Sequence, residues 1–318
     1  MWISPYKYVL SLGHLCSDIN QSILSAVLPF LIATYHYDYT TAAMLVTVSN
    51  VFGAFVQPFI GMLSDKKNKL LYMTLGVLLA SGGMAVTGFI SNFFGLWIVV
   101  IMSGIGVAMF HPQAAKLFNS VSSKNAKGKG MSIFSFGGKV GFTLGPVYTA
   151  FLMNLFGMKG TILFLIPGIV FGIVCSFFDK DFENLDVLEV EKKEEVKSEQ
   201  NDDWSGFIKL CCVVFSRSIL SNGISTFLAF YFIQQFSKSN SFASMLLSVF
   251  YGIGSITLLG GGIADCFGHR KMVRLSFCIF LPAIFIFTNT SHFVIALIML
   301  IFMTCGESLS YSPMVVLG

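Results

Sequence analysis

Long apolar runs, each close to the length of a membrane-crossing helix, follow one another along most of the chain. A helix needs about 20 apolar residues to cross the hydrocarbon core of a bilayer. The pattern predicts an all-α integral membrane protein with about ten helices. The first run has polar residues at its middle and lacks a small-residue cleavage site, so we predict a retained helix and not a signal peptide. The predicted spans are 6–33, 42–63, 70–90, 93–115, 130–156, 160–178, 206–236, 242–263, 272–289 and 293–316.

One charged segment interrupts the apolar pattern. Residues 179–203 contain eleven acidic and four basic side chains, against six bulky apolar ones. Dense charge with low hydrophobicity is typical of a solvated linker. We therefore predict an N-terminal six-helix half at 1–178, a charged cytoplasmic linker at 179–205, and an incomplete C-terminal half of about four helices at 206–318.

Composition and charge agree with a membrane protein. The chain is 55% hydrophobic and 11% charged, whereas soluble domains carry about 25% charged residues. Sixteen of the twenty basic residues fall in loops on the side of the N-terminus, or beside them, while only Lys159 and Lys238 fall in the opposite loops. This bias predicts a cell-membrane protein with a cytoplasmic N-terminus. The net charge of +4 is thinly spread, which argues against a nucleic-acid partner.

Two loops, two hundred positions apart, share one pattern. GMLSDKKNK at 61–69 and GGIADCFGHRK at 261–271 each place a glycine, then an acid four residues later, and a basic cluster at the end of an apolar run. Internal symmetry of this kind is typical of transporters built from repeats. We expect the loops to form a gate in which the acid caps a helix and the basic residues contact lipid headgroups. The predicted gating residues are Gly61, Asp65, Lys66, Gly261, Asp265, Arg270 and Lys271.

Ionisable side chains also occur deep inside four predicted helices: Asp18, Lys139, Arg217 and Glu307. Each isolated charge at that depth costs about 2.5–3.5 kcal/mol, so these groups should face a cavity or each other. We predict that Lys139 and Arg217 bind the anionic part of a substrate. Asp18 is the predicted carrier of a coupling proton, and Glu307 is the alternative carrier.

Polar residues form a stripe along the first helix. Ser11, His14, Asp18, Gln21 and Ser25 recur at steps of three or four, which places them on one helical face. Such a stripe either joins helices or lines a cavity. The second interpretation is favoured because His14 and Asp18 can both titrate when buried together, and His14 is therefore a predicted proton-coupling residue beside Asp18. Gln21 is a predicted substrate contact.

Two further helices carry special residues. His111 precedes Pro112, where we expect a kink. We predict that His111 contacts substrate, although a structural role remains open. In the fifth span, small residues recur every four positions and allow close approach of another backbone. The predicted packing residues are Gly137, Gly141, Gly145 and Pro146.

Several segments together resemble the major facilitator superfamily, and more narrowly its fosmidomycin-resistance branch: GHLCSDINQ (13–21), LPFL (28–31), QPFIGMLSDK (57–66), FHPQAAK (110–116), FSFGGKVGFTLGP (134–146) and SPMVVLG (312–318). The resemblance implies a 6+6 helix architecture and proton-coupled efflux of small, often anionic, drugs. The expected partners are a small-molecule substrate, a proton and the bilayer, with the chain as a monomer. Because that family has twelve helices, we expect this chain to lack the last two.

Other functions remain open at this stage. The same fold could import an organic acid or a sugar with a proton, or the chain could be a membrane protein that transports nothing. The sequence contains no phosphate-binding loop, zinc-ligand spacing or nucleophile elbow. We therefore predict no enzyme activity, no cofactor and no metal.

Overall fold

A computed structural model describes residues 6–64, 69–121, 127–178, 204–256 and 267–309, and these residues form helices joined by short connections, without strands. Each of the ten predicted spans contains a helix within these described ranges. The helices are α1 (Tyr6–Tyr35), α2 (Tyr39–Ser64), α3 (Lys69–Val86), α4 (Phe93–Val121), α5 (Lys127–Phe156), α7 (Trp204–Phe236), α8 (Asn240–Ile256), α10 (His269–Asn289) and α11 (Phe293–Leu309). The 3₁₀ turns η1 (Thr87–Phe89) and η3 (Gly157–Leu165) lie between them, and residues 166–178 are helical.

The helices have the length and composition of membrane spans. Seven helical segments of the described part are long and apolar enough to cross a membrane, and α11 is a shorter apolar helix. Bulky apolar side chains point outward as well as inward; Phe55 on α2 is 68% exposed and Phe177 is 78% exposed. An apolar exterior suits contact with lipid. The predicted all-α membrane class is therefore confirmed.

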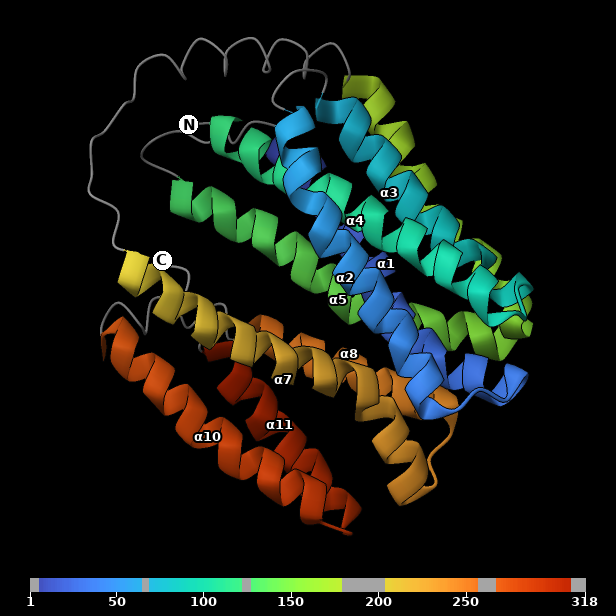
Figure 1. Cartoon of the computed structure of the whole chain (residues 1–318), viewed down its shortest axis with the longest axis vertical. Helices are drawn as coiled ribbons and strands as arrows, with labels where there is room; N and C mark the ends of the chain where they lie inside the picture. The colour runs from blue at the N-terminus through green and yellow to red at the C-terminus, as the bar shows by residue number, and fades with distance from the viewer. Residues whose placement is uncertain (1–5, 65–68, 122–126, 179–203, 257–266, 310–318) are drawn as a thin grey trace. The chain divides into compact units, whose positions relative to one another are not determined.

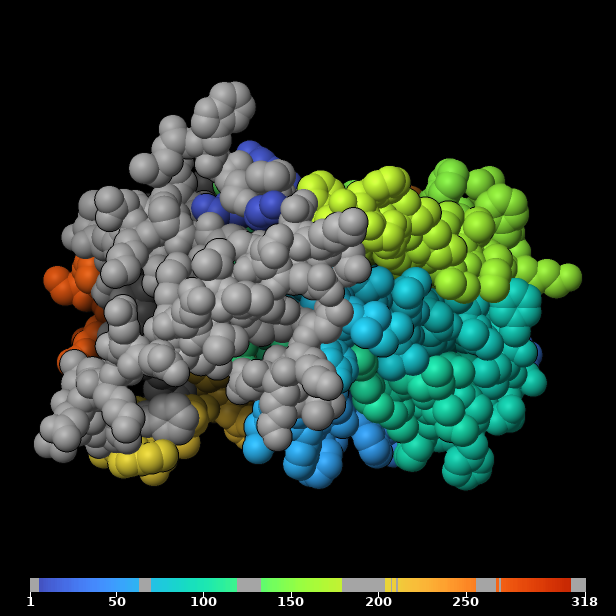
Figure 2. All heavy atoms as spheres, turned by 90° about the horizontal axis from the view of Figure 1, so that it is seen from above, coloured from blue at the N-terminus to red at the C-terminus, as the bar shows by residue number. Residues whose placement is uncertain are grey.

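The described helices divide into two compact units, Met1–Lys197 and Ser198–Gly318. In the first unit, α1 packs against α3, α4 and α5 (Figure 1). The turn and helix that end at residue 178 lie beside α3, as the yellow-green and cyan side chains in Figure 2 show. These elements enclose an apolar core that includes Leu10, Met73, Phe110, Phe118 and Phe171. α1 is consequently buried over most of its length.

Glycines allow α5 to approach α1 very closely. A Cβ added at Gly137 would lie 2.3 Å from the backbone carbonyl oxygen of Ser11, and one at Gly141 would lie 2.4 Å from that of Leu15. At Gly145 the added carbon would overlap the hydroxyl of Ser22. The small residues thus let two backbones meet where any side chain would separate them.

In the second unit, α10 packs against α11, and α8 contacts both α7 and α11. Tyr231 on α7 donates a hydrogen bond of 2.6 Å to the carbonyl oxygen of Phe287 on α10. Aromatic rings around Phe232 continue this contact toward Phe293 on α11. The charged segment 179–203 lies outside the described residues.

The fourth helix is longer than the predicted span 93–115, because α4 continues to Val121. Pro112 lies inside α4 and does not end it. A proline inside a helix removes one backbone hydrogen bond.

Candidate functional site

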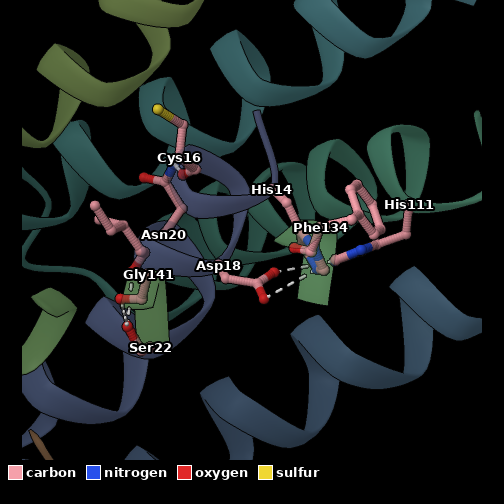
Figure 3. Close-up of polar contacts among 9 residues, drawn as sticks. His14, Cys16, Asp18, Asn20, Ser22, His111, Phe134 and Gly141 are labelled. Carbon is pink, nitrogen blue, oxygen red and sulfur yellow. Dashed lines mark hydrogen bonds and ion pairs between the residues drawn. The ribbon is translucent and has the colours of Figure 1, made fainter. Parts of the chain in front are cut away.

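Three titratable side chains meet in the first unit. Asp18 and His14 lie one turn apart on α1, and His111 comes from α4 (Figure 3). The Nε2 atom of His14 is 3.3 Å from Oδ2 of Asp18, and the Nε2 atom of His111 is 3.3 Å from Oδ1. The side chain of Asp18 is 5% exposed, that of His14 14%, and that of His111 28%. The carboxylate is therefore buried between two imidazoles. His111 is the most exposed of the three side chains, so solvent reaches the cluster at His111.

The orientation of His14 is fixed by α5. Its Nδ1 atom lies 2.8 Å from the carbonyl oxygen of Phe134, and its ring stacks on the Phe134 ring with centroids 4.2 Å apart. A carbonyl oxygen only accepts hydrogen bonds, so Nδ1 carries a proton. In the neutral ring Nε2 then has a lone pair, and this lone pair faces Asp18. Such an arrangement is repulsive unless a proton or another cation lies between the two atoms.

Gly138 on α5 leaves space beside this pair. A Cβ at this position would lie 2.5 Å from Oδ2 of Asp18 and 2.6 Å from Nε2 of His14. The glycine therefore keeps open the point where the two polar atoms meet. Sequence reasoning missed Gly138, since the four-residue spacing of Gly137, Gly141 and Gly145 drew attention to the adjacent positions.

The other predicted site residues of the first unit are arranged differently. Lys139 is half-buried on α5 and close enough to His14 to act on it electrostatically. Gln21 is exposed on α1, next to a run of buried residues. The cluster thus unites His14, Asp18 and His111, with Lys139 nearby.

Sequence reasoning also missed two buried polar residues of α1. Asn20 donates a hydrogen bond of 2.8 Å to the hydroxyl of Ser81 on α3. Ser22 donates one of 3.0 Å to the carbonyl oxygen of Ile19 and lies 3.5 Å from that of Gly141. These side chains join helices, which is one of the two roles predicted for the neighbouring polar stripe.

In the second unit, a partly buried ion pair joins Arg217 on α7 to Glu307 on α11. Nη2 of Arg217 contacts Oε1 of Glu307, and it also lies 3.4 Å from the backbone carbonyl oxygen of Glu307. The two side chains are 14% and 12% exposed. Leu220, Ser276 and Phe280 line a small cleft beside them. Two of the four charges predicted deep in the membrane thus neutralise each other.

Only part of each repeated loop lies within the described residues. Asp65, Lys66, Gly261 and Asp265 lie outside the described residues. The backbone carbonyl oxygen of Gly61 accepts a hydrogen bond of 3.3 Å from Nζ of Lys116 on α4. Arg270 and Lys271 are exposed in the first turn of α10.

The whole sequence of helices matches one known family. A model of the Major Facilitator Superfamily aligns with residues 10–318. The chain belongs to this superfamily. Members of the Major Facilitator Superfamily are transporters and not enzymes, as the sequence analysis predicted.

Individual members of the superfamily show how far the likeness extends. The Fosmidomycin resistance protein of Escherichia coli (strain K12) is 22% identical over 268 residues, which cover 83% of this chain and 66% of that protein. The chain thus spans just under two thirds of this relative. Among solved structures, a bacterial homologue of the human lysosomal transporter Spinster superposes with a TM-score of 0.78 at 16% identity, covering 98% of this chain and 73% of the other. A D-xylose–proton symporter superposes with a TM-score of 0.75 at 14% identity, covering 98% of this chain and 81% of the symporter. These superpositions show a shared fold.

Proposed function

We propose that the chain acts in proton-coupled secondary transport and that it exports small, anionic drugs such as fosmidomycin. Membership of the Major Facilitator Superfamily supports transport. The likeness to a protein named for fosmidomycin resistance supports export. The observation that carries proton coupling is the burial of Asp18 between two histidines.

The cluster has the chemistry that proton coupling needs. A buried carboxylate is costly in its ionised form unless a neighbouring group is positively charged. Imidazole is the side chain best suited to change its charge in a protein, and two imidazoles face this carboxylate. Every proton that enters changes the net charge of a site with little solvent. Conformations that expose the cluster differently will therefore bind protons with different affinities.

Lys139 is the proposed contact for an anionic substrate. It adds a positive charge near His14, within the same unit. Arg217 has Glu307 beside it, so an anion would have to compete with that carboxylate for the guanidinium. We expect Lys139→Gln to weaken binding of acidic compounds more than binding of neutral ones, measured as drug affinity in detergent. Equal losses for both classes would point to damaged folding instead.

The proximity of Lys139 to His14 favours a second function, proton-coupled import of an organic acid. Protonation makes the cluster of one carboxylate and two imidazoles more positive, close to Lys139. Electrostatically, a proton and an anion would then bind together, as in a symporter. In the export function, by contrast, protonation must promote substrate release through a change of conformation.

Transport in proteoliposomes separates these functions. A pH gradient is imposed across the membrane, and radiolabelled fosmidomycin is followed on both sides. If the chain exports the drug in exchange for protons, the drug and the protons should cross the membrane in opposite directions. Movement of an organic acid together with protons would establish the symporter instead. If neither class of compound moves, the proposed transport function is wrong.

The proposed orientation places the N-terminus and the segment 179–203 in the cytoplasm, because of the distribution of basic residues. A single cysteine is placed at position 190 or at Ser291, in a variant without the native cysteines. An impermeant thiol reagent added to intact cells should label the second position and not the first. Labelling at position 190 would reverse the orientation.

A further inference from the structure

We propose that His14, Asp18 and His111 form a binding site for a divalent transition-metal ion such as Zn²⁺. A metal ion and a coupling proton would compete for the Asp18 carboxylate, and metal binding can be measured without transport. The donor atoms, their distances and the space around them support a metal site.

The donor atoms are of the kind that selects a transition metal. Two imidazole nitrogens and one carboxylate oxygen lie within 4.8 Å of one another. Mg²⁺ and Ca²⁺ prefer sites made of oxygen alone, whereas imidazole nitrogen suits zinc and its neighbours in the periodic table. Three protein ligands leave a fourth position for water, as in zinc sites that retain an open position.

Both nitrogen–oxygen contacts of Asp18 are longer than a charge-assisted hydrogen bond. They measure 3.3 Å, and each nitrogen faces a different oxygen of the carboxylate, whereas a charge-assisted hydrogen bond is about 2.7–2.9 Å long. An ion between the three side chains would therefore be held by both oxygens of Asp18 and by one nitrogen of each imidazole. The buried Oδ1 atom of Asp18 has no hydrogen-bond donor among the described residues. A metal ion would satisfy this oxygen and both nitrogens at once.

The surroundings are arranged as in many histidine–metal sites. A metal-binding histidine usually donates its second ring N–H to a carbonyl or carboxylate, which fixes the ring and directs the other nitrogen to the ion. Phe134 provides this carbonyl for Nδ1 of His14 at 2.8 Å. Gly138 leaves the space beside Nε2 of His14 and Oδ2 of Asp18 open. His111, the most exposed ligand, gives an ion access.

Co²⁺ is a suitable probe because it replaces zinc and absorbs visible light when bound. The purified chain in detergent, with Cys211→Ser and Cys212→Ser to remove the adjacent exposed thiols, is titrated with Co²⁺. We expect one equivalent to bind with visible d–d bands, and Zn²⁺ to displace it. Asp18→Asn and His111→Gln should each lower the affinity by more than the roughly 10–100-fold that loss of an outer-shell partner costs. The exposed His36→Gln and His292→Gln are matched controls and should bind normally.

Two further variants distinguish loss of a metal ligand from misfolding as the cause of weaker Co²⁺ binding. His111→Cys should keep the ion and add a sulfur-to-cobalt charge-transfer band, which only direct ligation produces. Gly138→Ala should weaken binding although all three ligands remain, because its methyl group displaces the ends of the His14 and Asp18 side chains and no backbone. Gly82→Ala on α3, where an added Cβ meets nothing within 4 Å, is the control. Absence of Co²⁺ binding, or binding that persists in Asp18→Asn, would overturn the proposal.

Discussion

Each unit holds one carboxylate among its helices, but the basic side chains beside the two carboxylates differ. Asp18 lies between two histidines, whereas Glu307 pairs with an arginine. A guanidinium keeps its charge at every physiological pH, while an imidazole changes charge near neutrality. Glu307 thus has a permanent cation beside it, whereas the neighbours of Asp18 are side chains that can exchange a proton. Because of this difference we propose proton coupling at Asp18 and not at Glu307.

Breaking the fixed pair should have the largest effect on stability. Arg217→Gln leaves a partly buried carboxylate without its permanent cation. Loss of one partner from a fully buried pair costs about 3–5 kcal/mol, which is the upper limit for this pair. Asp18→Asn should cost much less, because it replaces a charge with a neutral group of the same shape. Thermal unfolding in detergent compares the two variants. Equal shifts in Tm would mean that the two acids do not differ as described.

A substitution in the close contact between α1 and α5 should have the next largest effect on stability. Gly141→Ala forces a methyl group against the backbone carbonyl oxygen of Leu15, and overpacking of this kind costs about 1–3 kcal/mol. Gly138→Ala on the same helix should lower Tm less, since its methyl group meets the ends of side chains. If Gly138→Ala were the more damaging change, the helices would not be in contact where the structure places them.

The third described acid provides a comparison outside the membrane spans. Asp38 is exposed before α2 and accepts a hydrogen bond of 2.7 Å from the backbone N–H of Thr41. Hydrogen bonds from the Thr41 side chain and backbone lower the pKa of Asp38 below its usual value. A lowered folded-state pKa contributes stability above the unfolded-state pKa, and this contribution is lost as the pH falls through the folded-state value.

Removing this carboxylate should have the smallest effect. Asp38→Asn keeps a helix cap but removes the group that titrates. We expect a slightly smaller loss of Tm between neutral pH and about pH 3 than in the unchanged chain. A steeper loss of Tm in the variant would contradict the lowered pKa.

The sequence predicted elements well because apolar length and helical spacing are local properties. His14 and Asp18 were placed together since residues four apart share a helical face. The contact between Asp18 and His111 could not be read in the same way, because it depends on how α1 packs against α4. Arg217 and Glu307 were recognised as opposite charges at similar depth, yet they were given separate roles in substrate and proton binding. Gly138 escaped notice because its importance comes from two side chains of another helix.

The central claim is that Asp18 couples transport to protons, and one comparison tests it directly. Asp18→Asn and the control Asp38→Asn are reconstituted in proteoliposomes, and fosmidomycin movement is measured with and without a pH gradient. We predict that Asp18→Asn still exchanges labelled for unlabelled drug at equal pH but no longer responds to the gradient, while Asp38→Asn behaves like the unchanged chain. Gradient-driven movement that persists in Asp18→Asn would contradict the account.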